Sequence, residues 1–193
     1  MIVYTSLFGN RDAPRKDIPC YQKNTMVNSD VLSAKIYKIL PHLFFPNENI
    51  FMWVDANIYL KKDKQYYVDK YLGDSDIVFC SHGERKNIFE EAEKLKHMNY
   101  FKSVSNVIEQ VKEYKAQGFT KDILYGCSVL IRKNNALVNR MCELWWAHIT
   151  RWQSRDQISL PFVVDKFPDL KINTVKWNDI ILDFIRNKHS GEL

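Results

Sequence analysis

Five consecutive apolar residues, Ile50 to Val54, end abruptly at an acid, and this segment limits what the chain can fold into. Such a run predicts a strand buried on both faces, which is typical of a parallel strand in an α/β sheet. Ligands bind in these sheets beyond the carboxyl ends of the strands. We therefore expect Asp55 and Asn57, which follow the run, to face one crevice and to bind a divalent cation and a phosphate. The alternative is that they form only a polar turn.

Length and composition favour one globular domain that spans residues 1–193. Apolar residues make up 46% of the chain and charged residues 26%, as in ordinary soluble proteins. The net charge of +5 is spread along the chain, with no block of lysine and arginine. This pattern argues against a nucleic-acid partner and suits a small molecule that carries phosphate.

Targeting signals and disulfide patterns are missing from the sequence. No segment has the apolar length of a transmembrane helix, and the N-terminus lacks a basic-then-apolar signal. The four cysteines form no C-x-x-C pair, and Cys80 and Cys127 lie within apolar runs where a buried thiol is expected. We therefore expect a reduced, cytoplasmic protein without a membrane span.

Four further segments predict strands of the same sheet. Residues 1–6 and 76–82 are apolar or β-branched until a polar end, so their last residues are expected to share the crevice. Segment 126–131 instead begins with its small and polar residues, which indicates an antiparallel strand whose start faces the same crevice. Residues 171–175 are expected to form the last strand, at an edge. The predicted fold class is therefore α/β with a mixed sheet.

The loops that follow two of these strands carry candidate ligand-binding residues. After the first strand, Gly9 permits close approach of the backbone to a ligand, and Arg11 can meet a phosphate. Gly9 is otherwise only a turn residue. After the strand at 76–82, His82 can contact a donor or acceptor together with Glu84 and Arg85. The alternative for His82 is an exposed loop histidine.

Helices are expected between these strands. Lys35 and Lys38 lie three residues apart and share one helix face, so either can neutralise a diphosphate if that face borders the strand ends. The alternative is that both lysines are solvated. The expected helices cover residues 30–40 (capped by residue 28 or 29), 64–72, 87–117 as two helices broken near 100–105, 134–145, a helix opening at 154, and 180–185.

The helix that opens at Ser154 begins with three adjacent polar residues, Arg155, Asp156 and Gln157, just before an apolar run. Ser154 suits an N-cap, and the charge of Asp156 suits the positive end of the helix dipole. That dipole gives Asp156 a complete structural explanation. Three polar groups in succession exceed what capping needs, so they are also candidates for chemistry.

The motifs together resemble the glycosyltransferase-like family named after the plant mucilage-related and turgor-regulation-defect proteins. More distantly, their order is similar to that of glycogenin-type transferases of the GT-A fold, which implies a GT-A-like (Rossmann-like), mainly parallel central sheet with flanking helices. The residues that carry the resemblance are 35–42, 45–46, 53–55, 82 with 85, 89–93, 126–132 and 155–159.

The resemblance implies a metal site for Mn²⁺ or Mg²⁺ against the diphosphate of a nucleotide sugar. Asp55 would bind the metal, and Asn57 stands where the family-like pattern has a second aspartate. His189 would be the third ligand, although the local sequence is His-Ser-Gly and not His-x-x-Gly. Asn57 supplies only a neutral oxygen to such a site.

The resemblance also implies roles in donor binding and transfer. Gly126 would pass close to the donor sugar, Asp156 would bind a sugar hydroxyl, and Gln157, beside Arg155, would lie near the anomeric carbon. Lysine ammonium groups would neutralise the negative diphosphate, and the side-chain oxygens of Asp156 and Gln157 would stabilise positive charge on the sugar. The donor-binding residues implied are Thr5, Phe8, Gly9 and Arg11 in the turn for base and ribose, with Lys35, Lys38, Gly126, His82 and Arg85.

Three functions remain open from the sequence. The first is a glycosyltransferase that moves a sugar, with UDP as the expected nucleotide, to a glycan, a lipid-linked or another hydroxyl acceptor. The second is a non-catalytic nucleotide- or sugar-binding module, prompted by Asn57. The third is a hydrolase that uses His82 with Glu84, Glu90 or Glu91, although these glutamates otherwise suit a charged outer face.

Overall fold

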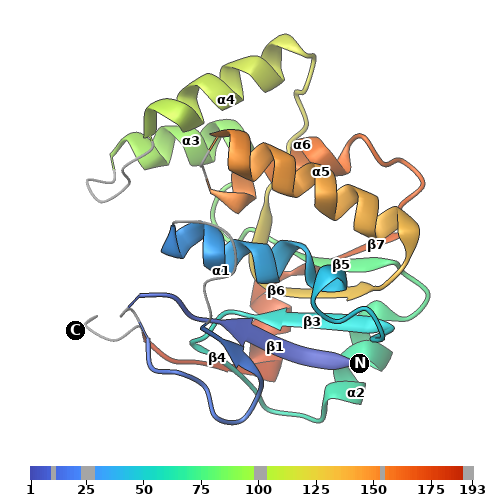
Figure 1. Ribbon diagram of the computed structural model, residues 1–193. Helices are drawn as coiled ribbons and strands as arrows, with labels where there is room; N and C mark the ends of the chain where they lie inside the picture. The colour runs from blue at the N-terminus through green and yellow to red at the C-terminus, as the bar shows by residue number, and fades with distance from the viewer. Residues whose placement is uncertain (10–11, 23–28, 98–103, 153–154, 189–193) are drawn as a thin grey trace.

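A six-stranded mixed sheet forms the centre of the computed structural model (Figure 1). The structure describes residues 1–9, 12–22, 29–97, 104–152 and 155–188. The strand order is β2-β1-β3-β6-β5-β7, and neighbouring strands are parallel except at β6, which runs antiparallel to both β3 and β5. The predicted fold class and the antiparallel direction of the strand that contains residues 126–131 are therefore confirmed.

The bounds of the elements follow the chain in order. The strands are β1 (Ile2–Ser6), β2 (Cys20–Tyr21), β3 (Ile50–Val54), β4 (Ile58–Leu60), β5 (Ile77–Ser81), β6 (Tyr125–Lys133), β7 (Ile172–Lys176) and β8 (Phe184–Arg186). The helices are α1 (Asp30–Ile39), α2 (Lys64–Tyr67) with a π-helical turn (Val68–Leu72), α3 (Ile88–Lys96), α4 (Val104–Ala116), α5 (Ala136–Trp152), α6 (Asp156–Val164) and α7 (Trp177–Ile180). Single 3₁₀ turns cover Pro41–Leu43 and Ile181–Asp183.

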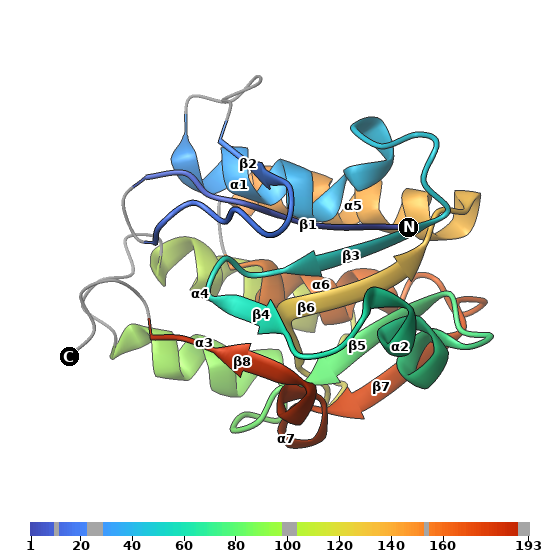
Figure 2. The ribbon, with the colours of Figure 1, turned by 90° about the horizontal axis from the view of Figure 1, so that it is seen from below.

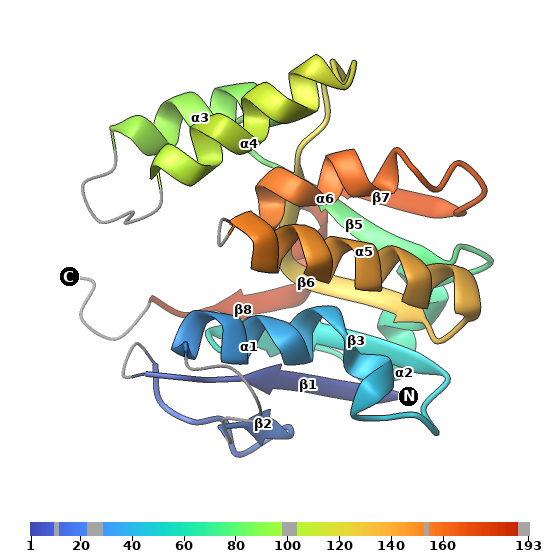
Figure 3. The same cartoon turned by 45° about the horizontal axis from the view of Figure 1, so that its top comes forward.

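Helices cover one face of the sheet and a smaller layer covers the other. Helices α1, α5 and α6 lie on the first face, with the α3–α4 hairpin packed outside α6 (Figure 3). The π-helical turn after α2, the two-stranded β4–β8 sheet and α7 lie on the second face, nearest the viewer in Figure 2. Among the described residues, no helix combines the length and apolar character needed to cross a bilayer.

Strand β3 is buried on both faces, as its sequence predicts. Phe51 and Trp53 belong to the core under the helices, whereas Met52 and Val54 belong to the core on the opposite face. All four side chains are at most 4% exposed. Since successive side chains of a strand point to opposite faces, one apolar run supplies both cores.

Local signals placed most helix boundaries correctly. Ser29 caps α1, because its side chain accepts a hydrogen bond from the Leu32 N–H at 3.3 Å. The expected cap at Asn134 is wrong by one residue: Asn135 accepts from the Val138 N–H at 2.9 Å, while Asn134 donates to the Glu48 carbonyl. The expected cap at Ser154 lies outside the described residues.

The expected helix at 180–185 is wrong in its last two residues. Helical structure ends at Asp183, and β8 then pairs with β4, placing Phe184 opposite Leu60. Phe184 is 3% exposed and its ring centroid lies 4.7 Å from that of Tyr67. Burial of this aromatic side chain against a distant part of the chain therefore overrides the local helical pattern.

Tyr67 ties the C-terminal segment to the body of the protein. Its buried hydroxyl donates to the Asp183 carbonyl at 2.6 Å and accepts from the Lys61 N–H at 3.0 Å. Farther along, Asn57 and Asn187 exchange two hydrogen bonds of 2.9 Å, one through the Asn57 side chain and one between backbone atoms. These contacts hold the chain after β8 beside the turn that follows Asp55.

We predict that Tyr67→Phe lowers the free energy of unfolding by about 1–3 kcal/mol, because buried N–H and carbonyl groups lose their partner. The measurement is the urea midpoint of the purified chain. Tyr59→Phe is the matched control, since the Tyr59 hydroxyl has no hydrogen-bond partner among the described residues. A midpoint that moves equally in both variants would contradict this role for Tyr67.

Candidate active site

The carboxyl ends of β1 and β3 and the start of β6 lie beside each other at one edge of the sheet. The backbone N–H of Asp55, just after β3, donates to the Ser128 carbonyl of β6 at 2.8 Å. On β1, Ser6 donates its hydroxyl to the Ala34 carbonyl of α1 at 3.0 Å. The antiparallel direction of β6 therefore brings the start of that strand, with Gly126, to the edge where parallel strands end.

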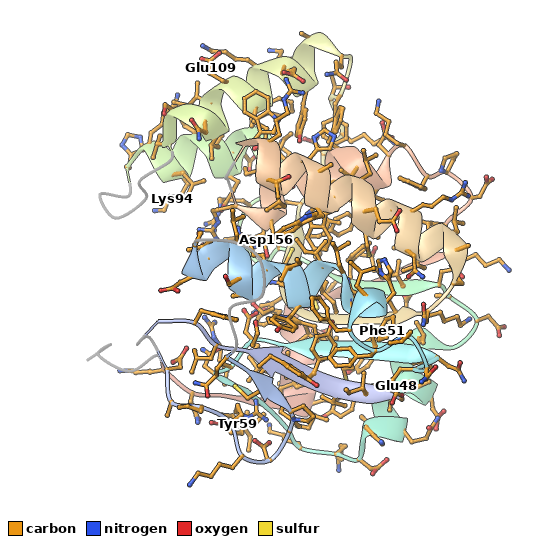
Figure 4. All side chains as sticks on the ribbon, in the orientation of Figure 1. Glu48, Phe51, Tyr59, Lys94, Glu109 and Asp156 are labelled. Carbon is orange, nitrogen blue, oxygen red and sulfur yellow. The ribbon has the colours of Figure 1, made fainter. Side chains whose placement is uncertain are left out.

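Lys38 of α1 lies between two carboxylates at this edge. Its Nζ is 2.8 Å from Asp156 Oδ2, at the start of α6, and 3.6 Å from Asp55 Oδ1. Figure 4 labels Asp156 where α1 faces the start of α6. Lys38 is only 7% exposed, and its ammonium lies 5.5 Å from the ring centroid of Trp53. The cluster joins α1, β3 and α6 through the mostly buried charges of Lys38 and Asp156 and the partly exposed charge of Asp55.

The two charges of this pair stabilise each other. Burial opposes the charged form of Lys38, but the carboxylates of Asp156 and Asp55 outweigh it and raise the pKa of Lys38 above its usual range. Burial likewise opposes the charged form of Asp156, but Lys38 and Lys35 outweigh it and hold the pKa of Asp156 well below its usual range. Both groups therefore carry charge across the neutral pH range.

Lys35 occupies the same helix face, as the spacing predicts. Burial lowers its pKa, against an opposing effect of Asp156. A negatively charged ligand beside Lys35 would favour its protonated form. The alternative of two solvated lysines is wrong for Lys38 and does not describe Lys35, which is partly buried.

A cavity of about 340 Å³, which we call the α1 pocket, opens beside this cluster. One wall is apolar and includes Phe8, Val31 and Ala34, and Trp53 contributes an aromatic surface. The lining also includes the polar Ser6 and six charged side chains, those of Lys35, Lys38, Asp12, Asp30, Asp55 and Asp156. An apolar wall beside two lysines suits a ligand that has a flat ring at one end and an anion at the other.

A second cavity of about 270 Å³ is lined by Arg155 and Gln157, the residues before and after Asp156 in the chain, and we call it the arginine pocket. Three arginines, Arg85, Arg155 and Arg186, line it together with Trp177. Its remaining lining includes Ser81, His82, Gly83, Glu84, Gly126, Ser128 and Gln157. Asp156 lines the α1 pocket and the next residue, Gln157, lines the arginine pocket, so the start of α6 separates the two.

Glu91 of α3 pairs with two arginines of the arginine pocket, whereas the sequence suggested either a charged outer face or a catalytic base for this residue. The side chain is 1% exposed and pairs with Arg85 Nε and, at 3.2 Å, with Arg155 Nε. Arg155 in turn donates to Gln157 Oε1 at 2.6 Å. Because its oxygen is occupied, Gln157 presents amide N–H donors to the pocket.

Several predicted site residues lie elsewhere. Thr5 is fully buried in β1 and does not line either pocket; its neighbour Ser6 lines the α1 pocket. Gly9 has a φ of +77° and lies near Asp30 Oδ2, to which a Cβ would come within 3.6 Å. Asn57 is 6% exposed and hydrogen-bonded to the C-terminal segment. Arg11 and His189 lie outside the described residues.

His82 has no carboxylate partner among the described residues. Its Nδ1 accepts hydrogen bonds from the backbone N–H groups of Glu84 and Arg85, at 3.2 and 3.1 Å. Burial and the charge of Arg85 lower the pKa of His82. The carboxylates of Glu84 and Glu91 pair with Arg85 instead, so the histidine–glutamate dyad of the hydrolase hypothesis is not formed.

Asp55 offers a divalent cation one carboxylate oxygen at this edge. Asp55 Oδ1 accepts from the Trp53 indole N–H at 2.9 Å and faces Lys38, whereas no partner is recorded for Oδ2 in the part of the chain that the structure describes. Within that part, no three histidine, cysteine or acidic side chains gather as a metal-binding group. The residues therefore fit a cation that arrives with its own phosphate ligands, which is how Mg²⁺ commonly binds.

Comparison with known proteins assigns a family. Residues 18–187 match the profile described as "TOD1/MUCI70, glycosyltransferase-like domain". The chain is 30% identical over 146 residues to "Probable hexosyltransferase MUCI70" of Arabidopsis thaliana, a match that covers 69% of this chain and 25% of that protein. The chain thus spans about a quarter of the length of this curated relative.

A solved structure shows the same fold. The crystal structure of a glycosyltransferase involved in the glycosylation of the major capsid of PBCV-1 superposes with a TM-score of 0.51 and 9% sequence identity. The superposition covers 96% of this chain and 93% of the other. At this identity the similarity concerns the fold alone, and it agrees with the GT-A-like fold expected from the sequence.

We predict that Lys38→Met and Asp156→Asn each lower the free energy of unfolding by about 1–3 kcal/mol, because each leaves a charge without its nearest partner, while Lys35 or Asp55 still compensates part of it. The double variant should lose less than the sum, since it removes both charges of this pair. Urea unfolding of the four proteins measures both effects.

The acid limb of the curve of stability against pH, where stability falls as the pH is lowered, tests the same ion pair independently. Because the pKa of Asp156 is lowered on folding, its stabilisation is present above the ordinary value of 3.8 and is lost as the pH falls below it. Asp156→Asn should therefore flatten this limb. Additive single effects together with an unchanged limb would contradict the pairing.

Proposed function

The chain belongs to the TOD1/MUCI70 glycosyltransferase-like family, and from that premise we propose that it transfers a sugar from a nucleotide-sugar donor to a hydroxyl acceptor. The observation that carries the proposal is the buried Lys38–Asp156 pair, with Asp55 beside it, between two pockets. A transferase needs a donor site and an acceptor site that meet at the reacting carbon. The α1 pocket and the arginine pocket meet at Asp156 and Gln157.

The nucleoside diphosphate of the donor, with UDP as the expected nucleotide, occupies the α1 pocket. Its base and ribose lie along the apolar wall that Phe8 and Ala34 help to form, and its diphosphate lies near Lys35 and Lys38. Lysine ammonium groups are effective partners of phosphate oxygens. A diphosphate bound there would favour the protonated form of Lys35, whose pKa is lowered by burial.

The donor sugar extends past Asp156 towards Gly126. A Cβ on Gly126 would meet no atom closer than 3.8 Å, so packing within the protein does not require a glycine there. The missing side chain leaves room for a ligand at the boundary of the two pockets. Gln157 then directs its amide N–H groups at sugar oxygens.

The charges at the edge suit the electronic demands of sugar transfer. Negative charge develops on the departing nucleoside diphosphate, and the two lysines of α1 stabilise it. Positive charge develops at the anomeric carbon, and the carboxylate of Asp156, whose lowered pKa keeps it ionised, stabilises that charge. Asp156 and the lysines therefore act on opposite ends of the breaking bond.

A Mn²⁺ or Mg²⁺ ion fits beside Asp55 as a partner of the diphosphate. Asp55 Oδ2 would bind the ion, and the sequence suggests Asn57 and His189 as further ligands. The nearby ammonium group of Lys38 would repel the cation and so weaken its binding. When bound, the metal would supply Lewis-acid stabilisation of the leaving phosphate. Asp55→Asn should remove any metal-dependent part of the nucleotide affinity and leave the metal-free part.

Nucleotide binding tests the donor site. We predict that UDP raises the melting temperature of the chain, and that Lys35→Met weakens UDP binding about tenfold because one charge-assisted contact is lost. Thermal shift and isothermal titration, each with and without Mn²⁺, measure this. Lys94→Met, which removes an exposed lysine of α3, is the charge-matched control. Absence of binding by every nucleoside diphosphate tested would contradict the proposal.

Turnover separates an enzyme from a binding module, the second candidate suggested by the neutral Asn57. An enzyme releases UDP from its UDP-sugar, whereas a binding module binds the same ligand without releasing it. Gly126→Ala is the diagnostic variant, because it adds one methyl group at the sugar site where the protein itself has room. We expect it to keep the melting temperature and UDP affinity of the parent and to reduce UDP release by at least about tenfold.

A further inference from the structure

The arginine pocket carries more positive charge than donor binding requires. Its three arginines come from separate parts of the chain: Arg85 follows β5, Arg155 precedes α6 and Arg186 ends β8. None of them lines the α1 pocket, where two lysines already face the expected diphosphate. We therefore expect the arginine cluster to bind an anionic ligand group other than the diphosphate.

The carboxylates near these arginines do not balance them. Glu91 is shared between Arg85 and Arg155, and Glu84 pairs with Arg85 but has a side chain that is 79% exposed. An exposed ion pair of this kind holds its charge only weakly. Arg186 forms no ion pair with any residue that the structure describes. Three guanidinium groups thus face two carboxylates, one of them in solvent.

Glu91 also fixes the direction of the arginines. This carboxylate is buried and does not line the pocket, and it pairs with Arg85 and Arg155 on their side away from the pocket. Arg155 uses its Nε and one terminal nitrogen on Gln157, which fixes the plane of its guanidinium. A planar guanidinium held in place binds carboxylate or phosphate oxygens with two parallel hydrogen bonds and little loss of entropy.

Trp177 adds a flat surface to the same pocket. A Cβ on Gly83 would lie 3.3 Å from Trp177 Cδ1, so the indole packs directly over the backbone of the loop that follows β5. A side chain at position 83 would require this ring to shift by a few tenths of an ångström. An aromatic face beside convergent polar groups is typical of a small-molecule site, where it packs against the apolar face of a ring.

We propose that the arginine pocket is the acceptor subsite and that it selects acceptors carrying an oxyanion. The oxyanion is the carboxylate of an acidic sugar or the phosphate of a phosphorylated or lipid-linked acceptor. This inference rests on the proposed transfer function, since the acceptor hydroxyl must reach the sugar at Gly126 and Gln157. The charged group lies between Arg155 and Arg186, and the sugar ring packs on Trp177.

The test compares three sugars of equal ring size on the full chain saturated with UDP: glucose, glucuronate and glucose 6-phosphate. The reporter is the indole N–H resonance of Trp177, assigned with Trp177→Phe. We expect at least one anionic sugar to bind about tenfold more tightly than glucose, and we expect added salt to reduce this preference. Preference for glucuronate alone identifies a carboxylate acceptor, and preference for glucose 6-phosphate alone identifies a phosphate acceptor.

Arg186→Gln is the test variant, because its side chain is exposed and its loss leaves no buried charge. It should reduce the anionic preference about tenfold. Arg140→Gln, at an exposed position of α5 outside both pockets, should leave the preference unchanged. Retained UDP binding shows that each variant is folded.

Four results would overturn the inference. Equal binding of all three sugars, or a preference that Arg186→Gln does not alter, removes the oxyanion subsite while UDP binding and turnover still support the transferase. An anionic preference seen without UDP, abolished by UDP and sensitive to Lys35→Met places the anion in the α1 pocket instead. If no nucleoside diphosphate binds, the proposed function fails together with this inference.

Discussion

The buried ion pair between Lys38 and Asp156 is the interaction on which the geometry of the candidate site depends. It joins α1 to the start of α6 over the end of β3, in a place where either charge alone would be strongly unfavourable. Arg132 of β6 supports it from below, donating to the Lys38 backbone carbonyl and, at 3.2 Å, to the Tyr4 hydroxyl. The position of Lys38 is therefore determined by the core as well as by its partner.

Strand direction explains why two pockets share one edge. Parallel strands β1, β3 and β5 all end there, and antiparallel β6 begins there, so strand ends and a strand start converge. On one side α1 supplies lysines, and on the other the loops after β5 and before α6 supply arginines. The proposed donor and acceptor sites thus use different cations. Flexible lysine ammonium groups suit the diphosphate of the donor, and guanidinium groups held in one plane suit a planar anion of the acceptor.

The sequence predicted the parts of the fold that depend on local pattern. The apolar run at Ile50–Val54, the polar start of the strand at 126–131 and the shared face of Lys35 and Lys38 each follow from periodicity, and each is confirmed. The pairing of β4 with β8 was missed, because its partners lie more than 120 residues apart and neither has a strong strand pattern alone. Short strands gain their stability from the surface that they cover.

The sequence predicted which residues of the candidate site carry charge, but it did not predict which residues they contact. A sequence shows that Glu91 is acidic, but its burial between Arg85 and Arg155 arises only when α3 packs beside α6. Thr5 and Asn57 are polar residues near strand ends, yet burial and pairing with the C-terminal segment determine what they contact.

The central claim is that one edge of the sheet holds a donor site and an acceptor site on opposite sides of the Lys38–Asp156 pair. A crystal structure of the chain with UDP tests it most directly. We expect the nucleoside to pack against Phe8 and the diphosphate to lie within hydrogen-bond distance of Lys35, with no nucleotide in the arginine pocket. A diphosphate bound between Arg155 and Arg186 would contradict it.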